Sequence, residues 1–154
     1  LAEPFSKAYS FDTSEFEDAD VGSNVFVLGY PMSAIFGSFH PTITSGIVSN
    51  PFGFGEQPGE FQMTTKINPG NSGGPIFNEF GKIVGVATAR LDKAGIFKDE
   101  GIIADSMSIG VTSERALKFL NQPKISKASS GTYEYTAAEL YKYMRSGVVL
   151  IVGQ

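Results

Sequence analysis

The chain has no cysteine and only one histidine among its 154 residues. The absence of cysteine excludes disulfide bonds, thiol catalysis and thiolate metal sites within this chain. One histidine cannot form a cluster of imidazole ligands, and the carboxylates make no recognisable calcium-binding loop. We therefore expect neither a metal site nor a cofactor.

Positive charge is also scarce. Twelve lysines and arginines stand against sixteen acidic residues, so the formal net charge is -4. No basic stripe and no alternation of basic and aromatic residues is present, and nucleic acid is therefore a disfavoured partner. The acidic residues that gather between positions 12 and 20 are typical of a solvated linker.

Long apolar runs are missing as well. No segment is long or apolar enough to cross a bilayer, and Leu1 does not begin a signal peptide. Instead, glycine and proline separate short apolar runs at residues 25–28, 83–86 and 148–152. With 42% hydrophobic residues, a chain of 154 residues suits one domain with a real core. These features predict an all-β fold, an antiparallel barrel of short strands.

Residues 68–75, Asn-Pro-Gly-Asn-Ser-Gly-Gly-Pro, are the most informative segment. Gly70 can adopt backbone angles that a side chain forbids, and Gly73 and Gly74 allow other segments to approach closely. Such a turn exposes the hydroxyl of Ser72 as a nucleophile. If the amides of Gly70 and Ser72 converge, they can bind the oxyanion of an acyl-transfer intermediate. The alternative is an ordinary surface turn between two strands.

The residues around this segment resemble a known family. Residues 61–67 lead into it, and residues 76–86 lead out as an apolar hairpin that turns at Gly81. Together they resemble the serine region of trypsin-like proteases of the Deg/HtrA branch, which have a similar INPGNSGGP followed by a hairpin and a V-G-V/I strand. Residues 20–31 and 42–49 resemble the first two strands of that family's second barrel.

The resemblance covers residues 16–121 and makes the expected fold more specific. It implies the second, antiparallel Greek-key barrel of the trypsin-like fold, with a last strand at about 105–111 and a terminal helix at about 112–121. The chain is then expected to comprise an inter-barrel connection, the serine-bearing barrel, a linker and a helix-strand tail, at residues 1–15, 16–122, 123–131 and 132–154.

In this family the catalytic histidine and aspartate come from a first barrel, N-terminal to everything matched here. The resemblance therefore implies a serine endopeptidase that forms an acyl-enzyme on Ser72, with the amides of Gly70 and Ser72 as oxyanion donors. An N-terminal protease barrel would be the partner that supplies His and Asp. Because serine is a poor nucleophile without an oriented base, we expect this chain to be inactive alone. A non-catalytic peptide-binding or assembly module, a pseudoprotease, is the alternative.

Two residues of the chain itself are candidates for the missing base. His40 lies in a loop between two predicted strands, and no acidic residue close in sequence can orient it. It is expected to be an exposed loop histidine. Serine-lysine dyads exist on other folds, but the resemblance places Lys66 in the wall below the nucleophile. A substrate-pocket or strand-surface role is therefore expected for this lysine.

The resemblance also implies how a substrate is held. Many trypsin relatives have an aspartate before the serine, which pairs with a new N-terminus, whereas this chain has the uncharged Asn71. Pocket order would then depend on loops, oligomer contacts or a ligand.

An extended polypeptide substrate would pair with an edge strand. The expected substrate-binding residues are Thr88, Ala89, Arg90, Ile67 and Asn68. The resemblance to Deg/HtrA proteases also implies an extracytoplasmic location, periplasmic or secreted.

The C-terminal tail carries its own signals. Thr136 and Glu139 are spaced as a capping box, so an amphipathic helix is expected to follow, with Gly147 as its terminator. The β-branched run at residues 148–152 predicts a final strand. This strand would pair within the chain or, by strand exchange, with a neighbour in a homo-oligomer. The tail is too short for the PDZ domain that often follows Deg/HtrA protease domains.

Overall fold

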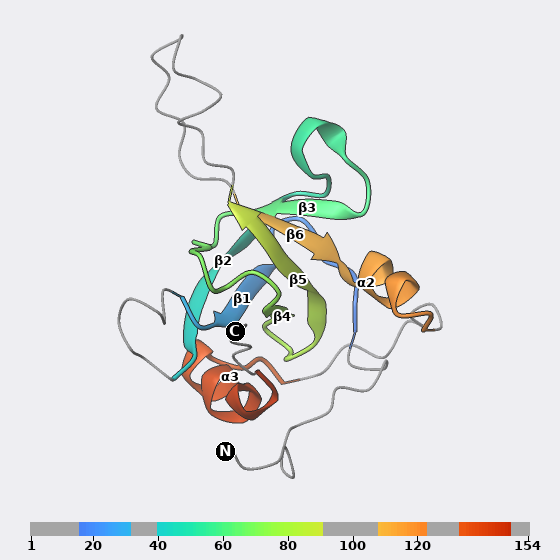
Figure 1. Cartoon of the computed structure of the whole chain (residues 1–154). Coiled ribbons are helices and arrows are strands. Elements are labelled where there is room, and N and C mark those ends of the chain that lie inside the picture. The colour runs from blue at the N-terminus through green and yellow to red at the C-terminus, as the bar shows by residue number, and fades with distance from the viewer. Residues whose placement is uncertain (1–15, 32–39, 91–107, 123–132, 149–154) are drawn as a thin grey trace, which may run out of the picture.

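The computed structural model describes residues 16–31, 40–90, 108–122 and 133–148 (Figure 1). Its strands are β1 (Asn24–Gly29), β2 (Thr42–Asn50), β3 (Glu60–Met63), β4 (Pro75–Asn78), β5 (Ile83–Arg90) and β6 (Ser108–Thr112). Its helical elements are α2 (Ser113–Phe119), α3 (Ala137–Met144) and the short turns η2 (Phe54–Glu56) and η4 (Arg145–Gly147).

The strands form a closed antiparallel barrel in the order β1-β2-β3-β6-β5-β4, and β4 closes it by pairing with β1. The barrel therefore contains two meanders, β1 to β3 and β4 to β6. The Greek-key barrel expected from the sequence is confirmed. The connection from β3 to β4 passes from one meander to the other, and it carries Ser72.

The barrel interior is filled by alternate strand residues, because successive side chains of a strand point to opposite faces. The core cluster consists of Val25, Val27, Val48, Phe61, Met63, Ile67, Ile76, Val84 and Ala87. Room for the Phe61 ring comes from Gly110 on the neighbouring strand β6 and Gly85 on β5. A Cβ added at Gly110 would lie 2.6 Å from the ring Cζ, and one at Gly85 would lie 2.7 Å from the ring Cε1. The glycines therefore allow one large ring to fill the interior.

The β4–β5 hairpin turns at Gly81, as predicted. Gly81 has φ of 75°, in the left-handed region that glycine adopts without steric cost. The side chain of Asn78 holds the turn, since its Oδ1 accepts hydrogen bonds from the backbone N–H groups of Phe80 (3.1 Å) and Lys82 (2.9 Å). Its Nδ2 donates to Glu17 Oε2 at 2.9 Å. The hairpin is thus a well-fixed surface for the tail.

The tail forms the predicted helix, and α3 packs against β2. Thr136 and Glu139 make the expected capping box, and Leu140 is completely buried. Val148 belongs to a second apolar cluster. That cluster also contains Leu28, Phe77 and Ile83, with Phe16, Tyr30, Ile43 and Met144 packed against it. Apart from Val148, the final strand predicted at 148–152 lies outside the described residues.

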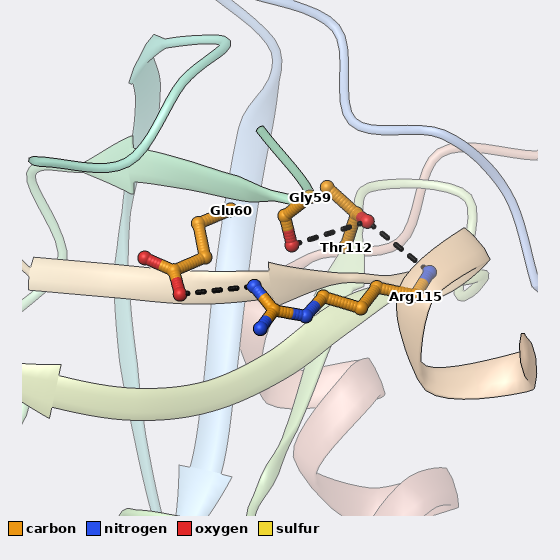
Figure 2. A network of polar contacts seen from close by, with 4 residues as sticks. All are labelled: Gly59, Glu60, Thr112 and Arg115. Carbon is orange, nitrogen blue, oxygen red and sulfur yellow. Dashed lines mark hydrogen bonds and ion pairs between the residues drawn. The ribbon is translucent and has the colours of Figure 1, made fainter. Parts of the chain in front are cut away.

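The start of α2 is tied to the beginning of β3 (Figure 2). The Thr112 hydroxyl caps the helix by accepting from the Arg115 N–H at 3.3 Å, and it donates to the Gly59 carbonyl at 3.4 Å. The Arg115 guanidinium donates to Glu60 Oε1 at 3.1 Å. These contacts position the helix that follows the last barrel strand.

The last strand and the helix after it differ slightly from their predicted ranges. β6 begins at Ser108 and ends at Thr112, and α2 ends at Phe119. The predicted strand residues 105–107 lie outside the described part of the chain, and the proposed four-part division remains a prediction. None of the helices in the described ranges is long and apolar enough to span a membrane.

Candidate active site

Ser72 is exposed on a turn that two left-handed glycines shape. Gly70 has φ of 100° and Gly73 has φ of 84°, angles that disfavour any residue with a side chain. The prediction for Gly70 is confirmed. For Gly73 the physical reason differs from the one predicted, because no neighbouring atom lies within 4 Å of an added Cβ. Its left-handed backbone, and not a close approach, requires glycine there.

Close approach does explain Gly74. A Cβ at this position would collide with the Leu28 carbonyl oxygen and lie 2.9 Å from that of Asn71. The end of β1 also lies directly against the turn, because a Cβ at Gly29 would lie 2.8 Å from Asn71 Cα. Two glycines on facing segments therefore let the turn rest directly on β1.

Hydrogen bonds fix the peptide groups on both sides of Asn71. The Gly70 carbonyl accepts from the Tyr30 N–H at 3.2 Å, and the Asn71 N–H donates to the Asn68 carbonyl at 2.9 Å. The Asn71 carbonyl accepts from the Gly74 N–H at 2.9 Å. Because a trans peptide points its N–H opposite its C=O, this last bond also sets the direction of the Ser72 N–H.

The amides of Gly70 and Ser72 themselves donate to no backbone carbonyl of the described residues. By contrast, the Gly73 N–H donates to the Ala87 carbonyl at 2.7 Å, and the Ala87 N–H donates to the Gly74 carbonyl at 2.9 Å. The turn is thus anchored to β5 by its glycines, while the two predicted oxyanion donors have no backbone acceptor within the described ranges.

Asn71 is buried, with 1% of its surface exposed. Its side-chain Oδ1 has no hydrogen-bond partner among the described residues. A carboxylate at this depth would need a compensating cation, because an unpaired buried charge costs far more than a neutral amide. The neutral side chain therefore suits a turn that is held by backbone contacts.

The Ser72 hydroxyl donates to the Thr88 carbonyl at 3.0 Å. A carbonyl oxygen orients the hydroxyl but cannot remove its proton at neutral pH. His40 is exposed, as predicted, and Lys66 is exposed as well. Within the described residues, neither side chain is hydrogen-bonded to Ser72. The geometry therefore leaves Ser72 presented but without a base from this part of the chain.

Three of the five predicted substrate-binding residues, Thr88, Ala89 and Arg90, lie where β5 runs past the end of β4. Pairing between these strands stops at Val86, whereas β5 continues along β6 to Arg90. The register shifts between Ala87 and Ala89, so Thr88 is the extra residue of a bulge. Beyond Ala87, the other edge of β5 has no strand partner among the described residues. Thr88 is exposed on this segment.

The two remaining predicted contacts have different environments. Ile67 is 1% exposed and belongs to the barrel core, so only its main chain could contribute to a pocket wall. Asn68 is half-buried, and its carbonyl accepts from Asn71. Sequence reasoning missed Tyr30, whose N–H holds the Gly70 carbonyl. Its only sequence signal is its place near the end of the first predicted strand segment, residues 20–31.

The closed barrel and its exposed serine turn are typical of the trypsin-like peptidase fold. Residues 3–86 match the family described as the trypsin-like peptidase domain, and the chain belongs to this family. Within it, the chain is a serine-bearing barrel of the Deg/HtrA type.

Curated relatives are similar along most of the chain. Identity is 28% over 122 residues to the serine protease Do-like HtrA of Lactobacillus helveticus, covering 74% of this chain and 28% of that protein. It is 29% over 164 residues to a serine protease HtrA-like protein of Staphylococcus aureus, covering 94% of this chain and 20% of the relative. The chain thus spans less than a third of the length of these relatives.

Solved structures share the fold. The serine endoprotease from Yersinia pestis superposes with a TM-score of 0.51 at 23% identity, over 68% of this chain and 32% of that chain. The HtrA-type protease AlgW, solved with a decapeptide, gives a TM-score of 0.51 at 22% identity, over 69% of this chain and 31% of the other.

Proposed function

We propose that this chain contains the serine-bearing barrel of a serine endopeptidase that hydrolyses peptide bonds through an acyl-enzyme on Ser72. One observation carries the proposal: an exposed serine lies on a turn whose peptide groups are fixed, while the amides of Gly70 and Ser72 have no backbone acceptor among the described residues. Membership of the trypsin-like peptidase family supports the same reaction.

In this proposal, Ser72 Oγ attacks the scissile carbonyl while a histidine from an N-terminal barrel removes its proton. The carbonyl oxygen becomes negatively charged and accepts hydrogen bonds from the amides of Gly70 and Ser72. The histidine then protonates the leaving amine, and an acyl-enzyme remains. Water, deprotonated by the same histidine, hydrolyses the ester and frees Ser72. An aspartate from that barrel would orient the histidine.

The proposed substrate is an extended polypeptide that pairs with β5 at Thr88, Ala89 and Arg90. The support for this binding mode is the edge of β5 beyond Ala87, which has no strand partner among the described residues. Backbone hydrogen bonds of this kind bind a peptide with little dependence on its side chains. Ile67 through its main chain and Asn68 would line the adjoining pocket. We propose an extracytoplasmic location by analogy with Deg/HtrA proteases.

The isolated chain is expected to lack useful peptidase activity. Removing the serine or the histidine of a serine-protease triad lowers turnover by about a millionfold in a well-studied example. Here the hydroxyl of Ser72 donates to the Thr88 carbonyl, which cannot serve as a base. Activity would therefore require a natural protein that also contains the first barrel.

A binding module without turnover is the second candidate function. The hydrogen bond from Ser72 to the Thr88 carbonyl is compatible with holding a peptide and not cleaving it. So is the edge of β5 that has no strand partner in the described part of the chain. In that case the family's barrel would serve recognition or assembly. The two candidates differ in whether bound polypeptide is hydrolysed.

The test is hydrolysis of an unfolded polypeptide such as casein by the natural full-length protein. The Ser72→Ala variant should lose cleavage and keep binding. Ser49→Ala is the matched control, because Ser49 is an exposed serine on β2, away from the turn. Peptide binding without cleavage by the wild-type protein would reject the endopeptidase and support the binding module.

A further inference from the structure

Tyr30 contacts both the serine turn and the C-terminal tail. Its backbone N–H donates to the Gly70 carbonyl at 3.2 Å, and its hydroxyl donates to the Val148 carbonyl at 3.1 Å. Tyr30 follows the last residue of β1, so the strand ladder does not fix its position. These two hydrogen bonds and the packing of its ring hold it in place.

The tail end of this link is firmly attached to the barrel. Val148 is 8% exposed and packs with Leu28, Phe77 and Ile83, and the Tyr30 ring packs against the same cluster. The Tyr135 N–H also donates to the Glu79 carbonyl at 2.7 Å. Figure 1 shows α3, in red, at one end of the barrel, beside β2. A docked tail thus supplies a fixed acceptor for the Tyr30 hydroxyl.

The turn end of the link lies at a sensitive peptide group. Gly70 has φ of 100° and no side chain, so little in its own structure prevents the peptide after it from rotating. That peptide is held by the Tyr30 N–H on its carbonyl side and by the Asn68 carbonyl on its amide side. If the Tyr30 N–H no longer bonded to the Gly70 carbonyl, the peptide plane between Gly70 and Asn71 could rotate. This peptide lies between the two predicted oxyanion donors, the amides of Gly70 and Ser72.

We propose that Tyr30 is a positioning residue through which the docked tail orders the amides of Gly70 and Ser72. The inference rests on the proposed function, because it assigns a role in the same oxyanion site. Burial and, secondarily, the nearby Tyr141 raise the pKa of Tyr30, so its hydroxyl remains a donor at neutral pH. The tail is thereby part of the catalytic unit and more than a stabilising appendage.

The test compares Tyr30→Phe with Tyr133→Phe in the natural full-length protein. Both variants remove one tyrosine hydroxyl, but that of Tyr133 donates to Glu139 Oε1 within the tail at 2.8 Å. Hydrogen exchange, followed by mass spectrometry over residues 68–74, should rise roughly two- to tenfold in Tyr30→Phe and stay unchanged in Tyr133→Phe. The kcat of casein hydrolysis should fall in the first variant with little change in KM.

A second variant approaches the link from the tail. Met144 packs against the cluster that contains Val148, so Met144→Ala should loosen the docked tail. If the tail acts through Tyr30, exchange at residues 68–74 should rise here too, and adding Tyr30→Phe should increase it less than additively. Exchange in the turn that equals wild type in both variants would overturn the inference. Failure of the proposed function would be distinct, because wild-type protein would then cleave no substrate whatever the exchange rates.

Discussion

The replacement Leu140→Ala tests whether the tail is part of the folded unit. Leu140 has no exposed surface, and it lies on α3, which packs against β2. Truncation of a fully buried leucine to alanine costs about 2 to 5 kcal/mol, from lost transfer free energy and the cavity left behind. For a chain of this size, each kcal/mol lowers Tm by about 2 to 4 °C. A loss of about 3 kcal/mol therefore predicts a decrease of about 6 to 12 °C.

The assay is thermal unfolding followed by circular dichroism, with Leu120→Ala as the matched control. Leu120 is 58% exposed, so its truncation should change the free energy of unfolding by less than about 0.5 kcal/mol. Tryptic cleavage at Lys142 and Arg145 provides a local measure of docking, and it should accelerate only in Leu140→Ala. Equal Tm values for the two variants, with equal cleavage rates, would refute the docked tail.

Two further predictions concern the turn and the helix cap. Gly74→Ala would place a Cβ against backbone oxygens that cannot move aside. It should therefore destabilise the protein by about 1 to 3 kcal/mol and slow fluorophosphonate labelling of the full-length protein. An unchanged Tm and unchanged labelling would contradict this packing. Hydrogen bonds lower the pKa of Glu139 below its ordinary value of 4.5, and the largest contribution comes from the Thr136 backbone N–H. Because the folded pKa lies below the unfolded one, this stabilisation is present above about pH 4.5 and is lost as pH falls through the folded pKa. Glu139→Gln should show less acid sensitivity in urea melts, and identical pH profiles would reject the cap's contribution.

Local signals predicted the elements well. Glycine at the hairpin, short apolar runs and the capping box each depend on a few neighbouring residues, and the structure has the corresponding turn at Gly81, the barrel strands and the start of α3. The exposed serine followed from the same kind of local pattern, because glycine spacing restricts what the backbone around Ser72 can do.

Contacts between distant segments could not be predicted in this way. The resemblance places Ile67 in a pocket wall, whereas burial of its side chain in the barrel core leaves only its main chain for that role, which local sequence does not reveal. The contact of Tyr30 with Val148 spans 118 residues and leaves no trace in local sequence. For Gly73, sequence showed the need for glycine but not whether space or backbone angle imposes it.

The most direct test of the central claim is to locate the adduct of a fluorophosphonate probe in the natural full-length protein. Peptide mass spectrometry should find the probe on Ser72 alone. Replacement of the histidine that we propose for an N-terminal barrel should abolish the reaction. No adduct, or an adduct on another serine that persists in Ser72→Ala, would contradict the assignment of Ser72 as the nucleophile.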